Sequence, residues 1–120
     1  FINGDGETSR DFCYIDNTVQ INLLAATTDN DDATDQIYNV AYGDSTSLNK
    51  LHQIIEVGLK QRLNDLKSKS PIYQNFRIGD VRHSLADISK AKSLLNYDPS
   101  HSIHDGLDET LDWYVKTLLN

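Results

Sequence analysis

Several residue types and patterns are scarce or missing in this chain of 120 residues, and each absence narrows what it can be. Cysteine occurs once, at Cys13, so no disulfide can form within the chain, and a reducing, cytoplasmic compartment is expected. No apolar run approaches the roughly 18 residues of a membrane-spanning helix, and no signal peptide is recognisable. Methionine is absent and the chain begins at Phe1, which predicts a piece of a longer protein.

Positive charge is scarce in the first 49 residues, where Arg10 is the only cation among nine carboxylates. The net charge of −7 makes nucleic acid and anionic membranes poor partners. Residues 50–97 hold nine of the 11 lysines and arginines, so an anion-binding surface should draw on this middle part. Two interpretations of Arg10 remain open. It forms a local salt bridge with Glu7 or Asp11, or it faces a cleft and binds an anion.

Hydrophobic periodicity predicts one mixed α/β domain over residues 1–120. Helices are expected at 16–27, 48–63, 88–95 and from 103 onward, and extended segments at 11–15, 36–42, 72–78 and 81–86. Asp16 is expected to cap the first helix and the turn at 43–47 the second. Ser102 and Asp105 resemble a capping box for the last helix, with Asp in place of Glu.

The sequence contains no recognisable catalytic or metal-binding motif. The acidic run at 29–35 lacks the glycine and the closing glutamate of an EF-hand, so it is expected to be a solvated loop. Cys13 has no evident cationic neighbour and is expected to be a small buried apolar residue. His101 and His104 have no third ligand in sight, so no metal site is expected. Neither a glycine-rich dinucleotide fingerprint nor a Tyr-x-x-x-Lys pair occurs, so no catalytic residue is expected in this chain.

Three segments, in order along the chain, carry a family resemblance. Residues 4–17 read GDGETSRDFCYIDN, which resembles the R-D-[FY]-x-[YH]-[VI]-x-D stretch of the extended short-chain dehydrogenase/reductases. Residues 38–51 read YNVAYGDSTSLNKL and are similar to that family's Y-N-[VLI]-[AG]-x-G segment. Residues 77–99 read RIGDVRHSLADISKAKSLLNYDP and resemble its later R-x-G-D stretch with a following [AS]-D-x-[ST]-K. The resemblance implies an α/β fold, as the C-terminal, substrate-binding portion of an enzyme whose Rossmann half is missing.

The resemblance also implies roles for five residues of a UDP-sugar site. Arg10 and Arg77 would grip the diphosphate, which suits guanidinium forks because they bind phosphate oxygens bidentately. Asp80 would bond near the nucleotide ribose or order the arginines, and its alternative is a plain turn residue. Asn39 would lie by the nucleoside. Ser84 would stand near the sugar ring, and its alternative is to cap the strand before the next helix.

The activity implied by the resemblance is that of NAD-dependent nucleotide-sugar epimerases, in particular the UDP-N-acetylglucosamine 4-epimerases of bacterial surface-polysaccharide pathways. NAD would be bound by the missing N-terminal half, so this fragment alone is expected to bind no cofactor and to be inactive. The intact enzyme would be a homodimer, and the fragment would self-associate through uncovered apolar faces of helices 16–27 and 48–63. Two alternatives stay open: a nucleotide-sugar dehydratase or decarboxylase of the same superfamily, and a small non-catalytic binding domain.

Overall fold

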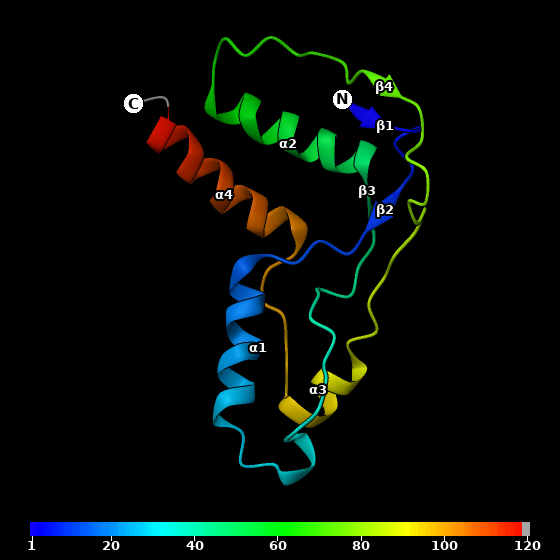
Figure 1. Ribbon diagram of the computed structural model, residues 1–120. Helices are drawn as coiled ribbons and strands as arrows, with labels where there is room; N and C mark the ends of the chain where they lie inside the picture. Colours follow the sequence, from blue (N-terminus) through cyan, green and yellow to red (C-terminus); the bar gives the residue numbers. More distant parts are fainter. Residues whose placement is uncertain (119–120) are drawn as a thin grey trace.

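The structure, a computed structural model, describes residues 1–118, so residues 119 and 120 of the predicted domain lie outside the described part. The molecule is elongated, with principal extents of 54 × 39 × 17 Å, and consists of two lobes (Figure 1). The sheet lobe, uppermost in the figure, holds four short strands with helices α2 (Leu48–Arg62) and α4 (Ile103–Leu118). The helical lobe holds α1 (Ile15–Thr27), the 3₁₀ helix η1 (Asp31–Ala33) and α3 (Ser89–Leu95). The closely packed pairs of elements all lie within one lobe.

The strands of the sheet lobe bring distant segments of the chain side by side. β1 (Ile2–Asn3) pairs in parallel with β4 (Tyr73–Gln74), and β2 (Ser9–Arg10) pairs antiparallel with β3 (Thr46–Ser47). A single parallel bridge joins the β2 residue Ser9 to His83. The N-terminal segment therefore lies between the start of α2 and the segment that follows β4.

Two of the predicted helix caps are confirmed. Ser47 precedes α2, and its hydroxyl oxygen accepts a hydrogen bond from the backbone N–H of Lys50 at 3.2 Å. Before α4, the Ser102 N–H donates to the carboxylate of Asp105 at 3.0 Å, and the Asp105 N–H donates to the Ser102 hydroxyl at 3.3 Å. This is the reciprocal geometry of a capping box, which satisfies two N–H groups that have no partner inside the helix.

Helices α2 and α4 pack closely because one of them carries a glycine at the contact. Gly58 of α2 faces Leu111 of α4 so closely that a Cβ there would lie 2.5 Å from a leucine methyl carbon. Arg62, whose side chain is only 14% exposed, crosses from α2 to α4 and donates to the carboxylates of Asp108 and Asp112 at 2.6 Å each. The apolar face predicted for α2 is half-buried in this contact, and none of its residues is fully buried.

The apolar core lies in the helical lobe, between α1, α3 and the segment 36–42. Tyr97 is 1% exposed, and its hydroxyl donates to the carbonyl of Ala41 at 2.8 Å. Burial raises the pKa of the Tyr97 phenol far above its usual value, so it stays a neutral donor. Asn96, with φ of 54°, ends α3 as predicted. The buried apolar residues of this core are Ile21, Ala33, Ala41, Ile88, Ala91, Leu95 and Tyr97.

The predicted strands at 11–15 and 36–42 are wrong. Within residues 1–118, β2 ends at Arg10 and α1 begins at Ile15, while residues 36–42 carry no strand ladder. A strand is stabilised by hydrogen bonds to a neighbouring strand, and the described part of the chain supplies no such neighbour to either segment. The side chain of Asp11 instead accepts from the backbone N–H groups of Tyr42 and Gly43, at 3.1 and 3.0 Å, and ties the two segments together.

The first helix buries a different face from the one that its apolar residues predict. Asn17 and Ile21 are buried, whereas Ile15, Val19 and Leu23 are 60, 47 and 61% exposed and form an apolar stripe at a spacing of four residues. The helix also begins before the predicted cap, with Tyr14 at the N-cap and Asp16 inside the first turn. No helix of residues 1–118 has the length and apolar character needed to cross a membrane.

Candidate functional site

A cleft of about 680 Å³ opens in the sheet lobe, beside the paired strands β1 and β4. Three of the five predicted site residues, Arg10, Arg77 and Asp80, line it. Arg10 comes from β2, and the other two come from the segment after β4. The cleft also takes in apolar side chains of α2 and the segment 69–72 that leads into β4. Strand pairing therefore brings Arg10, from the first family motif, into one cleft with Arg77 and Asp80, from the last.

The salt bridge of Arg10 is neither of the two local ones considered from sequence. Its Nη2 donates to the carboxylate of Asp80 at 2.5 Å, and its Nη1 donates to the carbonyl of Ser9 at 2.8 Å. Glu7 instead accepts from an amide side chain of α2, and Asp11 holds the loop before β3. The Arg10 and Asp80 side chains are 32 and 36% exposed, so this ion pair lies at the surface of the cleft and water can reach it.

Arg77 is held by an amide rather than by an acid. With the Asn3 side chain oriented so that its oxygen faces Arg77, that oxygen accepts from Nε at 2.8 Å and from Nη2 at 3.1 Å. The parallel register places Asn3 opposite Gln74, shortly before Arg77 in the chain, which explains the contact. A neutral partner orients the guanidinium and leaves its positive charge uncompensated.

The charge balance of the cleft favours an anion. Arg10, Arg77 and Lys69 line it, against the single carboxylate of Asp80. An ion pair as exposed as Arg10 with Asp80 contributes only about 0–1 kcal/mol, because water screens it. Such a pair can therefore yield to, or share its guanidinium with, an incoming phosphate. Two guanidinium groups at one cleft match the several oxygens of a diphosphate.

Asn39 and Ser84, the other two predicted site residues, do not line the cleft. The side-chain amide of Asn39 donates to the backbone carbonyl of Asp87 at 3.1 Å, which places it in the helical lobe. The backbone N–H of Ser84 donates to the carbonyl of Ser9 at 3.2 Å, and its side chain is exposed. A contact of either residue with a ligand stays a prediction.

The segment 76–82, which carries two of the cleft residues, is anchored from its outer side. Arg82 forms an ion pair with Asp5 at 2.6 Å, and this hydrogen bond holds the pKa of the Asp5 carboxyl below its usual value. The Arg82 guanidinium also lies 5.5 Å from the centre of the Phe76 ring. Gly4, with φ of +79°, lies directly under that ring, where a Cβ would come within 2.3 Å of a ring carbon. The turn at Gly4 therefore lets the N-terminal segment and the 76–82 segment approach each other.

The sequence did not reveal several polar residues of the cleft, among them Asn3, His52 and Lys69. Asn3 precedes every recognised motif, and only the β1–β4 pairing shows that it reaches Arg77. His52 lies on α2 among apolar residues that also line the cleft. Lys69 lies in the loop between α2 and β4, outside the motifs that carry the family resemblance. The concentration of cations in residues 50–97 was the available signal for Lys69, but it does not say which cation faces inward.

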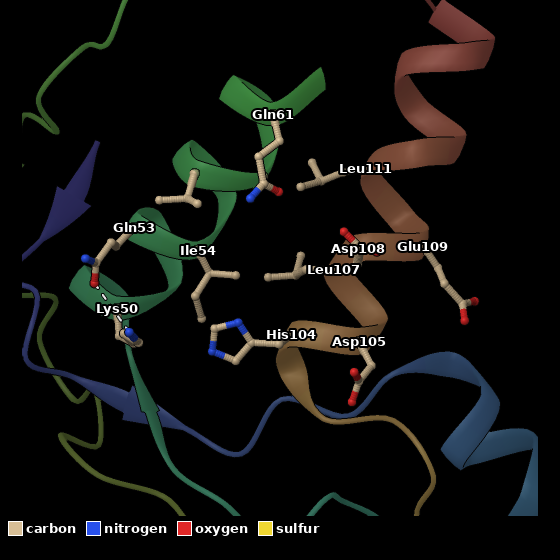
Figure 2. Close-up of a pocket in the computed structure, with 12 residues that line it drawn as sticks. Lys50, Gln53, Ile54, Gln61, His104, Asp105, Leu107, Asp108, Glu109 and Leu111 are labelled. Carbon is tan, nitrogen blue, oxygen red and sulfur yellow. Dashed lines mark hydrogen bonds between the residues drawn. The ribbon is translucent and has the colours of Figure 1, made fainter. Parts of the chain in front are cut away.

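A second hollow, of about 530 Å³, lies between α2 and α4 (Figure 2). Ile54 and Leu107 face each other across it, with Lys50 and His104 near one end. None of the five predicted site residues lines it, and its α4 wall carries carboxylates that would repel a phosphate. We therefore assign the candidate anion site to the cleft beside β1 and β4. The carboxylates of the second hollow are Asp105, Asp108 and Glu109.

Comparison with known proteins identifies the family of the chain. A protein-family model described as GDP-mannose 4,6 dehydratase matches residues 1–110. The UDP-glucuronate 4-epimerase of Thermodesulfobacterium geofontis is 38% identical over 113 residues, which are 93% of this chain and 32% of that protein. The chain thus spans about a third of the length of this curated relative.

Solved structures show the same fold. The UDP-glucuronic acid 4-epimerase from Bacillus cereus, in complex with UDP-glucuronic acid and NAD, matches with a TM-score of 0.82 and 31% identity, over 98% of this chain and 35% of that one. The UDP-N-acetylglucosamine 4-epimerase from Methanobrevibacter ruminantium M1, in complex with UDP-N-acetylmuramic acid, matches with a TM-score of 0.79 and 36% identity, over 98% and 34%. The predicted α/β class is confirmed, and the match falls on a C-terminal portion of these enzymes. The chain belongs to the extended short-chain dehydrogenase/reductases, within the family described as GDP-mannose 4,6 dehydratase.

Proposed function

We propose that this chain is the UDP-sugar-binding part of an NAD-dependent UDP-sugar 4-epimerase, with UDP-N-acetylglucosamine as its substrate, in the synthesis of a surface polysaccharide. The observation that carries the proposal is the convergence of Arg10 and Arg77 on one cleft. Similarity to 4-epimerases whose structures contain UDP-sugars supports it. The UDP-N-acetylglucosamine enzyme has 36% identity to this chain and the UDP-glucuronate enzyme of Thermodesulfobacterium geofontis has 38%, so the proposed sugar depends on the motif resemblance and not on the identity.

The two arginines would bind the diphosphate and leave the sugar free to turn. The Ser9 carbonyl and the Asp80 carboxylate hold the Arg10 guanidinium from two sides, so little side-chain entropy remains to be lost on binding. Asn3 holds Arg77 in the same way. Anchoring at the phosphates, away from C4, fixes the nucleotide while the sugar presents either face of C4 for reaction.

NAD would bind elsewhere in the protein. Within residues 1–118 no strand leads through a glycine-rich loop into a helix, which is the geometry that holds a dinucleotide pyrophosphate. We therefore assign no residue of this chain to NAD. The cofactor would accept a hydride from C4 of the sugar and return it. The residues of this chain would contribute binding and orientation of the UDP-sugar.

Titration of the chain with UDP tests the binding role directly. Arg10→Lys and Arg77→Lys keep the charge but remove the guanidinium fork, so each should weaken UDP binding about tenfold or more, since a charge-assisted hydrogen bond contributes roughly 1.5–3 kcal/mol. Arg62→Lys, the same change between α2 and α4, is the matched control and should leave the UDP affinity unchanged. Uridine, which lacks phosphates, should bind far more weakly than UDP to the unaltered chain. Equal affinities for UDP and uridine would contradict the proposal.

The reaction itself requires the longer protein of which this chain would be a part. With UDP-N-acetylglucosamine, epimerisation produces the C4 epimer of the same mass. The family description favours 4,6-dehydration as the second candidate, and that reaction would release a water and leave a keto-sugar. Mass spectrometry of the product separates the two, because only the dehydratase product is lighter by one water.

A further inference from the structure

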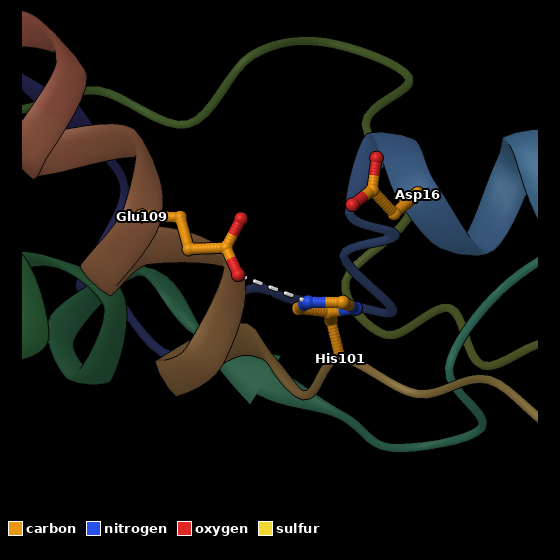
Figure 3. Close-up of side chains that lie close together, drawn as sticks. All are labelled: Asp16, His101 and Glu109. Atoms are coloured by element: carbon orange, nitrogen blue, oxygen red, sulfur yellow. Dashed lines mark hydrogen bonds and ion pairs between the residues drawn. The ribbon is translucent and has the colours of Figure 1, made fainter.

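Three potential metal ligands meet at the junction of the two lobes. Asp16 lies in the first turn of α1, His101 lies in the segment before α4, and Glu109 lies on α4 (Figure 3). One ligand atom from each residue lies within 4.8 Å of the other two. The histidine is thus grouped with two carboxylates from other elements, and not with His104, the neighbour considered from the sequence.

The position of His101 is fixed by hydrogen bonds outside the cluster. Asn17 is completely buried, and its side chain both donates to the His101 carbonyl at 2.7 Å and accepts from the His101 N–H at 3.0 Å. The ring Nδ1 lies 2.8 Å from the hydroxyl of Ser100, which leaves Nε2 directed at Glu109. Such an outer hydrogen bond is what orients the ring of a metal-bound histidine. Since Asn17 follows Asp16 in α1, the same contacts fix Asp16 relative to His101.

The two carboxylates are placed to receive positive charge. One oxygen of Glu109 lies 3.1 Å from the His101 Nε2, and the other accepts from the Tyr14 hydroxyl at 2.9 Å. Asp16 makes no side-chain hydrogen bond or ion pair with residues 1–118, although it faces the histidine–glutamate pair.

We propose that Asp16, His101 and Glu109 bind a zinc ion, with water as the fourth ligand. One imidazole nitrogen and two carboxylate oxygens are ligands that zinc accepts in a tetrahedral site. Ligand atoms around a tetrahedral zinc lie about 3.3 Å apart, so the three atoms, now within 4.8 Å of one another, would move closer together on binding. Because the ligands come from α1, from the segment before α4 and from α4, the ion would clamp the helical lobe to the sheet lobe.

Isothermal titration of the metal-stripped chain with zinc chloride tests the site. We expect one zinc per chain with micromolar affinity and a higher melting temperature in the presence of zinc. Asp16→Asn, His101→Ala and Glu109→Gln should each weaken binding about tenfold or more. His104→Ala changes an exposed histidine of α4 that is outside the cluster, so it is the matched control and should bind zinc as the unaltered chain does. Circular dichroism of each variant without zinc verifies that the fold is retained.

The outcomes of the titration distinguish a specific zinc site from non-specific binding of zinc to the protein surface. Saturable 1:1 binding that depends on all three ligands and not on His104 supports the proposal. Millimolar or non-stoichiometric binding would mean an adventitious ion only and would overturn it. So would unchanged affinity in the folded His101→Ala variant, or an equal loss in His104→Ala. If His101→Ala does not fold, the isosteric Asp16→Asn and Glu109→Gln variants decide by the same criterion.

Discussion

Replacing Gly106 with alanine should destabilise the chain far more than the same replacement at Gly58, although both glycines lie in helices at close contacts. A Cβ at Gly106 would lie 2.8 Å from Cβ and 2.6 Å from Cγ of Tyr14. Those atoms cannot move away without shifting the backbone that begins α1. A Cβ at Gly58 would lie 2.5 Å from the Cδ1 methyl of Leu111 and at an ordinary contact distance of 3.6 Å from Nη1 of Arg62, and the end of a leucine side chain can rotate.

The magnitudes follow from two opposing effects. Overpacking costs about 1–3 kcal/mol, and the rigid contact at Gly106 belongs at the upper end of that range. Alanine is favoured over glycine inside a helix by about 0.8–1 kcal/mol. Gly106→Ala should therefore lose about 2 kcal/mol of unfolding free energy, whereas in Gly58→Ala the helix preference roughly offsets the side-chain rotation of Leu111. Urea unfolding of both variants measures the difference, and equal midpoints would refute this account of the lobe junction.

Three further predictions concern acid stability, association and sugar selectivity. The hydrogen bond from Arg62 lowers the pKa of Asp112 in the folded state. The ionised Asp112 therefore stabilises the fold at pH values above the ordinary aspartate pKa of about 3.9, and this stabilisation is lost as the pH falls below that value. Asp112→Asn should therefore reduce the drop in urea midpoint between neutral and acid pH, and an unchanged drop would count against the pairing. The exposed apolar side chains of Val19 and Leu23 should make the chain self-associate. Replacing both residues with lysine should yield a monomer in sedimentation, and an unaltered chain that stays monomeric at high concentration would contradict this prediction. In the longer enzyme, Ser84→Tyr should lower kcat/KM for UDP-N-acetylglucosamine roughly 5- to 150-fold and largely spare UDP-glucose, whereas equal losses on both sugars would indicate general damage to the fold.

Structural features that depend on residues close together in the sequence could be predicted from it. The capping boundary of α4 and the start of α2 depend on side chains that bond to backbone groups three residues away, and both predictions are confirmed. The extents of α2 and α4 follow from apolar periodicity in the same way. The family motifs drew attention to Arg10 and Arg77, which the structure places on one cleft.

Features that depend on contacts between residues far apart in the sequence could not be predicted from it. Apolar alternation at 36–42 looks like a strand, yet residues 1–118 offer no strand beside it to complete the ladder. The partner of Arg10 is Asp80 rather than a neighbour in sequence, because the 76–82 segment folds back beside β2. Asn3 reaches Arg77 only through the parallel pairing of β1 with β4. Local pattern cannot choose among such long-range pairings.

We propose that two particular arginines bind the diphosphate of a UDP-sugar, and NMR of the arginine side chains tests this most directly. The chain has four arginines, so the Nε–H signals of their side chains can be followed individually by NMR as UDP-N-acetylglucosamine is added. We expect the signals of Arg10 and Arg77 to shift together with one binding constant. The signals of Arg62 and Arg82, which are held in ion pairs outside the cleft, should stay in place. Shifts confined to Arg62 and the groove between α2 and α4, or no shift of Arg10 and Arg77 at saturating ligand, would contradict it.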